Sequence, residues 1–296
     1  MKRYTYKARD EKELMVTLWD DVKAPVAVVQ VLHGMCEHME RFDEFAKVLN
    51  KAGFIVLGSD LRSHGYTDKE TLGLVEDENI FEESVSDALE LSAYAKVKYR
   101  LPIIVFGQGY GSFLLQRYLS YTCAQIHGAI LSGSALVEGA GLKINCWLTE
   151  GSIKPKNRSK KGTYVEKARA GFDKAFKGEG KNAWYTSDKD ELAKYNADEL
   201  CAVSYCQAFY HYMFEGFKSI NLSQHLKLRK DFPLLITSGE NDKIGDSSKL
   251  VAKYKGYGLN PTVITYKDAR HDLKSEICKN KVFEDVINFV NSCLPQ

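Results

Sequence analysis

Hydrophobic positions along this chain form two kinds of pattern, short apolar runs and longer amphipathic stretches. The short apolar runs predict strands at residues 13–19, 25–32, 54–57, 102–106, 128–131, 232–237 and 262–266. Apolar residues at helical spacing predict helices over residues 42–52, 81–99, 111–119, 247–257 and 281–293. Because strands and helices alternate, the pattern predicts an α/β fold with a doubly wound, mostly parallel sheet.

The alternation stops between residues 137 and 223. A basic run at 154–161 is followed there by many aromatic residues, among them Trp184, Tyr205 and Phe217. A linker would not carry so much apolar surface, so this segment is interpreted as a mostly helical insertion. We therefore expect a core formed by residues 1–136 and 224–296, with a helical cap at 137–223.

Composition narrows the class of protein. The 296 residues carry a formal net charge of +2, which argues against a nucleic-acid binder. The first residues lack the apolar segment of a signal peptide, and no run approaches the roughly 18 apolar residues of a membrane span. Seven cysteines without C-x-x-C spacing predict free thiols and a cytoplasmic location. No metal spacing is recognisable among His38, His64, His127, His211 and His225.

A glycine-rich turn, GQGYGS at residues 107–112, follows the apolar run at 102–106. Its layout is that of a nucleophile elbow, G-x-S-x-G, which lifts a serine hydroxyl above a parallel sheet. The position that should hold the serine is Gly109. The sequence thus predicts a hydrolase frame without its nucleophile.

Two further loops at predicted strand ends supply an acid and a histidine. Asp242 lies in the loop 239–246 and His271 in the loop 268–272. The order of nucleophile position, acid and histidine is the chain order of α/β-hydrolases. Asp242 would orient the imidazole of His271, which would exchange the nucleophile's proton. The backbone N–H groups of Met35 and Tyr110 would form the oxyanion hole.

Over nearly its whole length the chain resembles the monoacylglycerol lipase and lysophospholipase branch of the α/β-hydrolases, specifically its bacterial serine hydrolases. The similar motifs are HGMCEHMER at 33–41, DLRSHG at 60–65, GQGYGS at 107–112, GENDKIGD at 239–246 and ARH at 269–271, together with the cap segment 184–216. The resemblance implies hydrolysis of an acyl-lipid ester held under the cap, without metal or organic cofactor. The chain departs from the family at Gly109, Gln108 and Lys243-Ile244, and at Cys36 and Ser63, where the family has glycines.

Gly109 changes what the resemblance implies for activity. Without a side chain no acyl-enzyme can form, and losing a triad serine costs about six orders of magnitude in turnover. We therefore expect an inactive or nearly inactive relative. Alternatives are a nucleophile at Cys36 or Ser112 and water activated by His271. For Cys36 we favour a small residue that replaces a glycine in a turn, and for Ser112 a packing role.

Two other functional interpretations stay open: a non-enzymatic protein that binds an acyl ligand, and an esterase of small aromatic esters. The basic run 154–161 also allows transient contact of the cap with a membrane surface.

Overall fold

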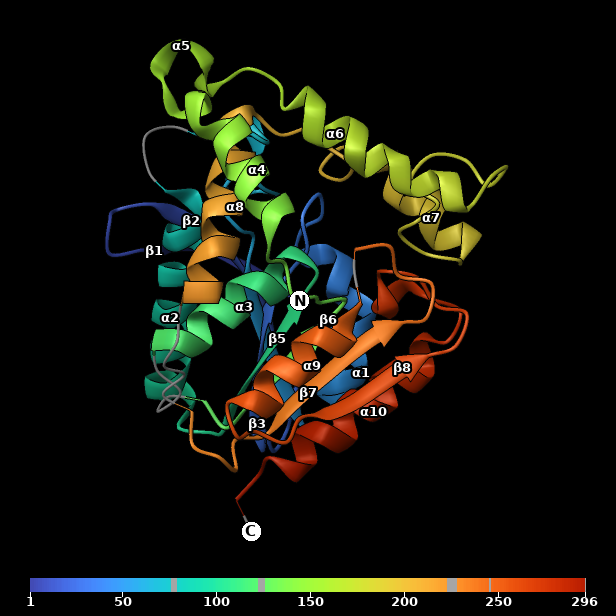
Figure 1. Ribbon diagram of the computed structural model, residues 1–296. Helices are drawn as coiled ribbons and strands as arrows, with labels where there is room; N and C mark the ends of the chain where they lie inside the picture. Colours follow the sequence, from blue (N-terminus) through green and yellow to red (C-terminus); the bar gives the residue numbers. More distant parts are fainter. Residues whose placement is uncertain (76–78, 122–125, 223–227, 245, 296) are drawn as a thin grey trace.

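The chain forms one eight-stranded sheet covered by helices on both faces (Figure 1). The structure is a computed structural model that describes residues 1–75, 79–121, 126–222, 228–244 and 246–295. The strands lie in the order β1-β2-β4-β3-β5-β6-β7-β8. Their bounds are β1 Lys2–Lys7, β2 Glu13–Trp19, β3 Ala27–Leu32, β4 Phe54–Ser59, β5 Ile103–Gln108, β6 Gly128–Ser132, β7 Leu234–Gly239 and β8 Thr262–Tyr266.

From β4 to β8 the neighbouring strands are all parallel, which confirms the predicted α/β class. In the register of the centre, Val29 of β3 pairs with Val56 of β4 on one side and with Ile104 of β5 on the other. Only β1 and β2 add antiparallel pairs at one edge. Parallel strands end at the same edge of a sheet, so the loops after β3, β5, β7 and β8 lie together.

Two hydrophobic cores lie on opposite faces of the sheet. Successive residues of β3 point to opposite faces, so that Val28 packs in one core and Val29 in the other. One face is covered by α2 Ile80–Tyr99, α3 Tyr110–Tyr121 and α9 Ser247–Gly256. The other is covered by α1 Asp43–Lys51 and α10 Lys279–Ser292. Short 3-10 turns are formed by Met39–Phe42, Lys69–Thr71, Glu150–Ile153, Gly171–Ala175 and Leu273–Ser275.

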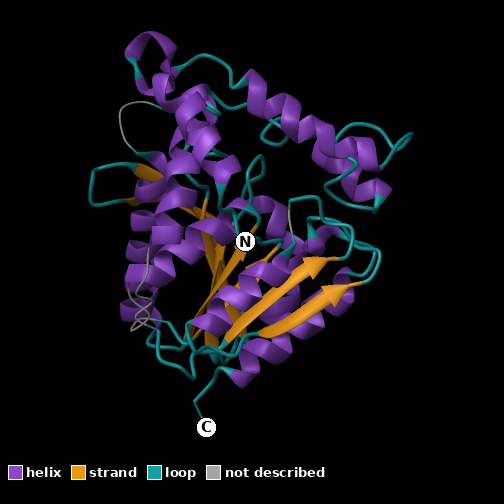
Figure 2. Ribbon diagram, viewed as in Figure 1, coloured by secondary structure: helices purple, strands orange, loops and turns teal. Residues whose placement is uncertain are grey.

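The segment between β6 and β7 is helical and stands over the end of the sheet where the parallel strands terminate (Figures 1 and 2). It contains α4 Ala140–Thr149, α5 Pro155–Arg158, α6 Thr163–Ala170, α7 Lys189–Ala197 and α8 Gln207–Leu222. Helix α8 packs against α2 and α3 through aromatic side chains, such as Phe217 against Phe81 and Phe113. We call this segment the cap.

Several details differ from or extend the sequence expectation. Strand β1 was not predicted, although its alternating KRYTYK pattern is typical of an edge strand with one exposed face. Cys36, Cys146, Cys201, Cys206, Cys278 and Cys293 carry free thiols, as expected, while Cys123 lies outside the described residues. His225 and Gly245 also lie outside them. No helix in the described ranges is long and apolar enough to cross a membrane.

Candidate active site

The turn between β5 and α3 has the geometry of a nucleophile elbow. Gly109 adopts φ +51°, the left-handed conformation, and its N–H donates to Ser132 O at 2.9 Å. A Cβ on Gly111 would collide with the backbone of β3, and a Cβ on Gly107 would lie 2.6 Å from Gly111 O. Close packing against the backbone therefore requires glycine at 107 and 111, whereas a serine at 109 would meet the left-handed backbone and the side chain of His271.

Asp242 and His271 form a hydrogen-bonded pair at the ends of β7 and β8. Nδ1 of His271 lies 3.1 and 3.0 Å from the two carboxylate oxygens of Asp242. Both side chains are buried. Burial by itself lowers the pKa of His271, but the charge and hydrogen bond of Asp242 outweigh it, so that the pKa is raised. Asp242 is held in turn by Ile244, whose N–H donates to it at 2.8 Å.

The other ring nitrogen of His271 faces the elbow. A Cβ built on Gly109 would lie 2.8 Å from Nε2 of His271 and 3.9 Å from the Cα of Gly34. The imidazole thus extends toward the space that a serine side chain would fill. The three loops that the sequence assigned to one site do meet around Gly109.

The loop after β3 supplies the second side of the elbow. Gly34 donates its N–H to Oε1 of Glu37 at 2.6 Å, and Gly34 and Met35 line the cavity above Gly109. Tyr110 is the first residue of α3, where backbone N–H groups have no partner within the helix. The N–H groups of Met35 and Tyr110 therefore belong to the segments that flank Gly109 on either side.

A buried ion cluster, which the sequence did not reveal, fixes this loop. Nζ of Lys274 lies 2.8 Å from Oε2 of Glu37 and 2.6 Å from Oδ2 of Asp272. Tyr185 of the cap donates its hydroxyl to the same Glu37 oxygen at 3.1 Å. Because Asp272 follows His271 in sequence, the cluster joins the histidine loop, the loop after β3 and the cap. The only sequence signal for this cluster is the charge of the residues at 37, 272 and 274. Glu37 lies 235 or more positions before the other two, so the sequence does not link them.

Cys36 and Ser112, the other possible nucleophiles, are both engaged in packing. The guanidinium of Arg169 contacts Sγ of Cys36, and burial raises the pKa of the thiol despite that cation. Ser112 donates its hydroxyl to Gly109 O at 2.6 Å and lies 2.7 Å from the hydroxyl of Ser134. A buried thiol with a raised pKa is a poor source of thiolate, and a hydroxyl held by the backbone is a poor nucleophile.

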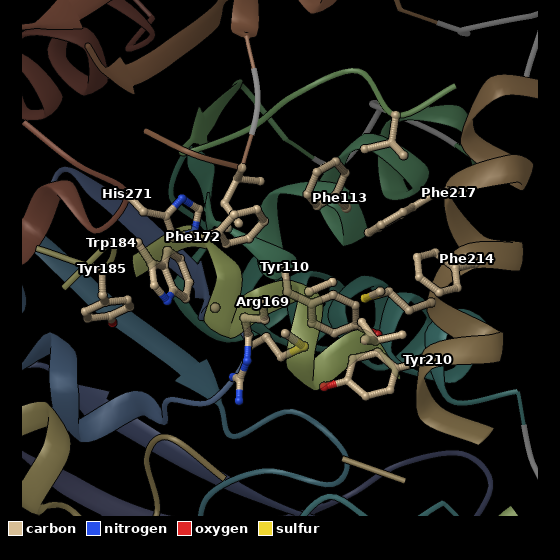
Figure 3. Close-up of a pocket in the computed structure, with 18 of the residues that line it drawn as sticks. Tyr110, Phe113, Arg169, Phe172, Trp184, Tyr185, Tyr210, Phe214, Phe217 and His271 are labelled. Carbon is tan, nitrogen blue, oxygen red and sulfur yellow. The ribbon is translucent and has the colours of Figure 1, made fainter. Parts of the chain in front are cut away.

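An apolar cavity of about 390 Å³ lies between Gly109 and the cap. Figure 3 shows His271 and Trp184 at one end of it, and Phe214 and Phe217 of α8 at the other. Other residues along its wall are Met35, Tyr110, Phe113, Val165, Arg169, Phe172, Tyr185, Tyr210, Met213 and Ile244. Of the cap aromatics, Tyr195, Tyr205 and Phe209 pack inside the protein instead.

Outside this site, His38, Asp198 and Cys201 bring their ligand atoms within 4.8 Å of one another. Nε2 of His38 lies 2.9 Å from Oδ2 of Asp198, and this hydrogen bond ties the loop after β3 to the cap. Asp198 and Cys201 are three positions apart, but His38 lies 160 positions before Asp198, so no spacing motif shows the group.

Comparison with known proteins agrees with this geometry. The model of the family Hydrolase_4 (serine aminopeptidase, S33) matches residues 23–277. The chain is 24% identical to a monoglyceride lipase homolog of Monkeypox virus over 292 residues, which cover 95% of each chain.

Solved structures share the fold over the full length. A carboxyl esterase from Bacillus coagulans, in complex with glycerol, superposes with a TM-score of 0.87 at 20% identity, covering 99% of this chain and 98% of the esterase. A soluble variant of monoglyceride lipase from Saccharomyces cerevisiae, in complex with a substrate analog, gives 0.74 at 18% identity, covering 100% and 95%. Both confirm the α/β-hydrolase fold that the resemblance implied.

Proposed function

We propose a function on the premise that the chain belongs to the Hydrolase_4 family. The protein takes an acyl-lipid ester of the monoacylglycerol or lysophospholipid type under its cap, and it hydrolyses that ester at most very slowly. One observation carries the proposal: Asp242, His271 and the loop after β3 converge on Gly109, a residue without a nucleophile, at the floor of an apolar cavity. The names of the relatives, which include monoglyceride lipases, support the ligand class.

The remaining groups support binding better than turnover. The backbone donors of Met35 and Tyr110 can still polarise an ester carbonyl. A water molecule activated by His271 would be the only route to hydrolysis at this site, and general-base catalysis alone supplies about 10²–10⁴-fold. Binding therefore survives the loss of the serine, while the covalent step does not.

A pair of valine variants tests the binding site. Val165 lines the cavity and is partly exposed, whereas Val97 on α2 is 78% exposed and distant from it. Val165→Glu is expected to weaken binding of monododecanoylglycerol at least about tenfold, because its carboxylate would lie unpaired in the acyl cavity. Val97→Glu should leave binding unchanged. Isothermal titration measures the affinity, and fatty-acid release measures turnover.

The outcomes separate the alternatives. Rapid release of fatty acid by the parent chain would contradict the proposal, as would equal binding by the two valine variants. Tighter binding of methyl cinnamate than of monododecanoylglycerol would favour a small aromatic ester as the ligand.

The cap also carries a surface that fits a membrane interface. Ile144, Trp147 and Leu148 lie on one face of α4, at helical spacing, and are 50–71% exposed. Ile153 and Tyr164 of the cap are exposed as well, and the basic run 154–161 follows α4 in sequence. Asn145 of α4 lines the cavity, so this helix borders the path of a lipid ligand. We propose that this cap face makes transient contact with the lipid surface.

Trp147→Ser tests the membrane contact. Its loss should weaken partitioning onto vesicles of phosphatidylcholine and phosphatidylglycerol by about tenfold, since burying a large apolar side chain contributes about 1.5–3 kcal/mol. Ile277→Ser is the matched control, because Ile277 is 74% exposed but lies outside the cap. Vesicle sedimentation measures both. Equal losses in the two variants, or no binding by the parent chain, would contradict a contact through α4.

A further inference from the structure

Several groups that favour an anion converge where the serine side chain is missing. Nε2 of His271 faces Gly109, at 2.8 Å from the position of a Cβ. Helix α3 begins at Tyr110, so its N-terminal backbone donors and the positive end of its dipole lie beside the same point. In an active hydrolase the serine would stand between these groups. Here the space between them is free of a side chain.

The imidazole is set up to carry a positive charge. Burial lowers the pKa of His271, but carboxylates around it raise the pKa overall. The carboxylates near the ring are Asp242, Asp272 and Glu37. The other charged or titratable groups near it are Lys274, which binds both Asp272 and Glu37, and Tyr185 and Arg169, which line the cavity. Both cations already have acidic partners: Lys274 pairs with Glu37 and Asp272, and Arg169 pairs with Glu166. The protonated ring can therefore donate Nδ1–H to Asp242 and Nε2–H to a ligand at Gly109.

A second, independent observation points to a ligand with hydrogen-bonding oxygens. The indole of Trp184 lines the cavity beside His271, with 5.3 Å between ring centroids (Figure 3). The residue is 6% exposed, and its Nε1–H has no hydrogen-bond partner in the described part of the chain. A buried donor without a partner is unfavourable, so a ligand oxygen that reaches Nε1 of Trp184 is favoured.

A neutral ester cannot use all of these groups. Its carbonyl oxygen accepts from backbone N–H groups but gains little from a cationic imidazole. A carboxylate has two oxygens and a full negative charge, so it forms charge-assisted hydrogen bonds to both kinds of donor. The rest of the cavity wall is apolar and suits a hydrocarbon chain.

We propose that the site around Gly109 is a receptor for a free monocarboxylic acid with an alkyl chain, bound through its carboxylate to His271 and the start of α3 in preference to the corresponding ester. This inference rests on the proposed acyl site and deepens it by naming the ionic form of its ligand. The carboxylate lies in the space left by the serine, and the chain extends under the cap.

The test compares dodecanoate with methyl dodecanoate, which shares its chain but has no charge. At pH 6 the acid should bind the parent protein at least tenfold more tightly than the ester in isothermal titration. The acid ionises near pH 4–5 and an ordinary histidine near about 6.5. As pH rises through the raised pKa of His271, the ring loses its charge and the preference should fall toward one. The affinity for the ester should not change with pH.

Variants assign the effect to the ring. His271→Gln removes the cation and should abolish the preference for the acid over the ester. His127→Gln changes a histidine distant from the cavity and should leave the preference unchanged. If His271→Gln fails to fold, Asp242→Asn takes its place, because losing the carboxylate should move the pH midpoint down by a unit or more.

Each outcome of these titrations either supports or overturns the proposed carboxylate site. A preference that falls with pH and is lost in His271→Gln supports the proposal. Equal binding of acid and ester overturns it while leaving the acyl site in place. A preference that persists in His271→Gln, or that ignores pH in both the parent and Asp242→Asn, overturns it as well. If neither ligand binds, the proposed function fails with it.

Discussion

Gly109→Ser is expected to raise turnover of short p-nitrophenyl esters by about three orders of magnitude or more. The variant places a hydroxyl beside Nε2 of His271, which is oriented by Asp242. Removing a triad serine costs about 10⁶-fold, so restoring one should recover a large part of that factor. The left-handed backbone at position 109 costs a side chain of order 1–3 kcal/mol, which a protein of this size can tolerate.

The structure also explains why recovery should stay below the full factor. A Cβ at position 109 would lie 2.8 Å from Nε2 of His271, closer than such atoms normally approach. The ring must therefore shift, against its hydrogen bonds to Asp242 and its contact with Trp184. A serine that fits only after this shift forms a longer or misaligned bond to its base, and small misplacements are costly in catalysis.

Two controls isolate the hydroxyl. Gly109→Ala adds the same Cβ without the oxygen and should give no gain. Adding His271→Ala to Gly109→Ser should remove the gain, because the hydroxyl then has no base. Initial rates of p-nitrophenol release measure all of them. No gain from Gly109→Ser, in a chain that remains folded, would mean that position 109 or His271 has been assigned wrongly.

Lys274→Met is expected to lower the free energy of unfolding by about 3–5 kcal/mol. The side chains of Lys274, Glu37 and Asp272 are at most 2% exposed, and Lys274 is the cation that lies between the two carboxylates. Removing one partner of a buried ion pair leaves an uncompensated charge, which accounts for the size of the loss. Urea denaturation followed by circular dichroism measures it.

The loss should depend on pH in a definite direction. In the parent chain burial raises the pKa of Asp272, but Lys274 outweighs it and the pKa is lowered overall. The stability that this pair contributes is therefore present above the unfolded pKa of aspartate, about 3.9, and is lost as pH falls. The difference between parent and Lys274→Met should accordingly shrink toward low pH.

Lys281→Met provides the matched control. Lys281 pairs with Asp285 and Glu284 on the surface of α10, with 58% of its side chain exposed. Its loss should not change the denaturation midpoint measurably. An equally small effect from Lys274→Met would show that the buried cluster does not stabilise the fold.

The order of strands and helices was predictable because burial on both faces leaves a plain signal. Strand β3 is apolar at nearly every position and buried throughout, so its apolar run predicted the strand directly. The elbow was predictable because its alternate glycines directly follow an apolar run, and close backbone contacts require glycine at 107 and 111. The edge strand β1 was harder to predict, because four of its six residues are exposed and little distinguishes it from a loop.

Contacts between distant segments could not be predicted. The bond from Lys274 to Glu37 joins residues 237 positions apart, and that from Tyr185 to Glu37 spans 148. None of these three residues stands in a local sequence motif that would indicate its partner. The cavity wall is likewise assembled from the core and several cap helices, so its shape depends on how the cap folds back over the sheet.

Two departures from the resembled family have a backbone explanation. Cys36 and Ser63 stand where the family has glycines, and both adopt the left-handed conformation, at φ +64° and +65°. The chain has kept the turn at each place although a Cβ makes it costlier, by about 1–2 kcal/mol per residue. Gly109 is the reverse case, because there a residue strained in an active enzyme is replaced by one that adopts the same turn freely.

Covalent labelling with a fluorophosphonate tests most directly whether the chain is a hydrolase frame without its nucleophile. The reagent is applied to the parent protein and to Gly109→Ser, and peptide mass spectrometry locates any adduct. We expect no adduct on the parent chain and an adduct at position 109 of the variant. An adduct on Cys36 or Ser112 of the parent chain would contradict it.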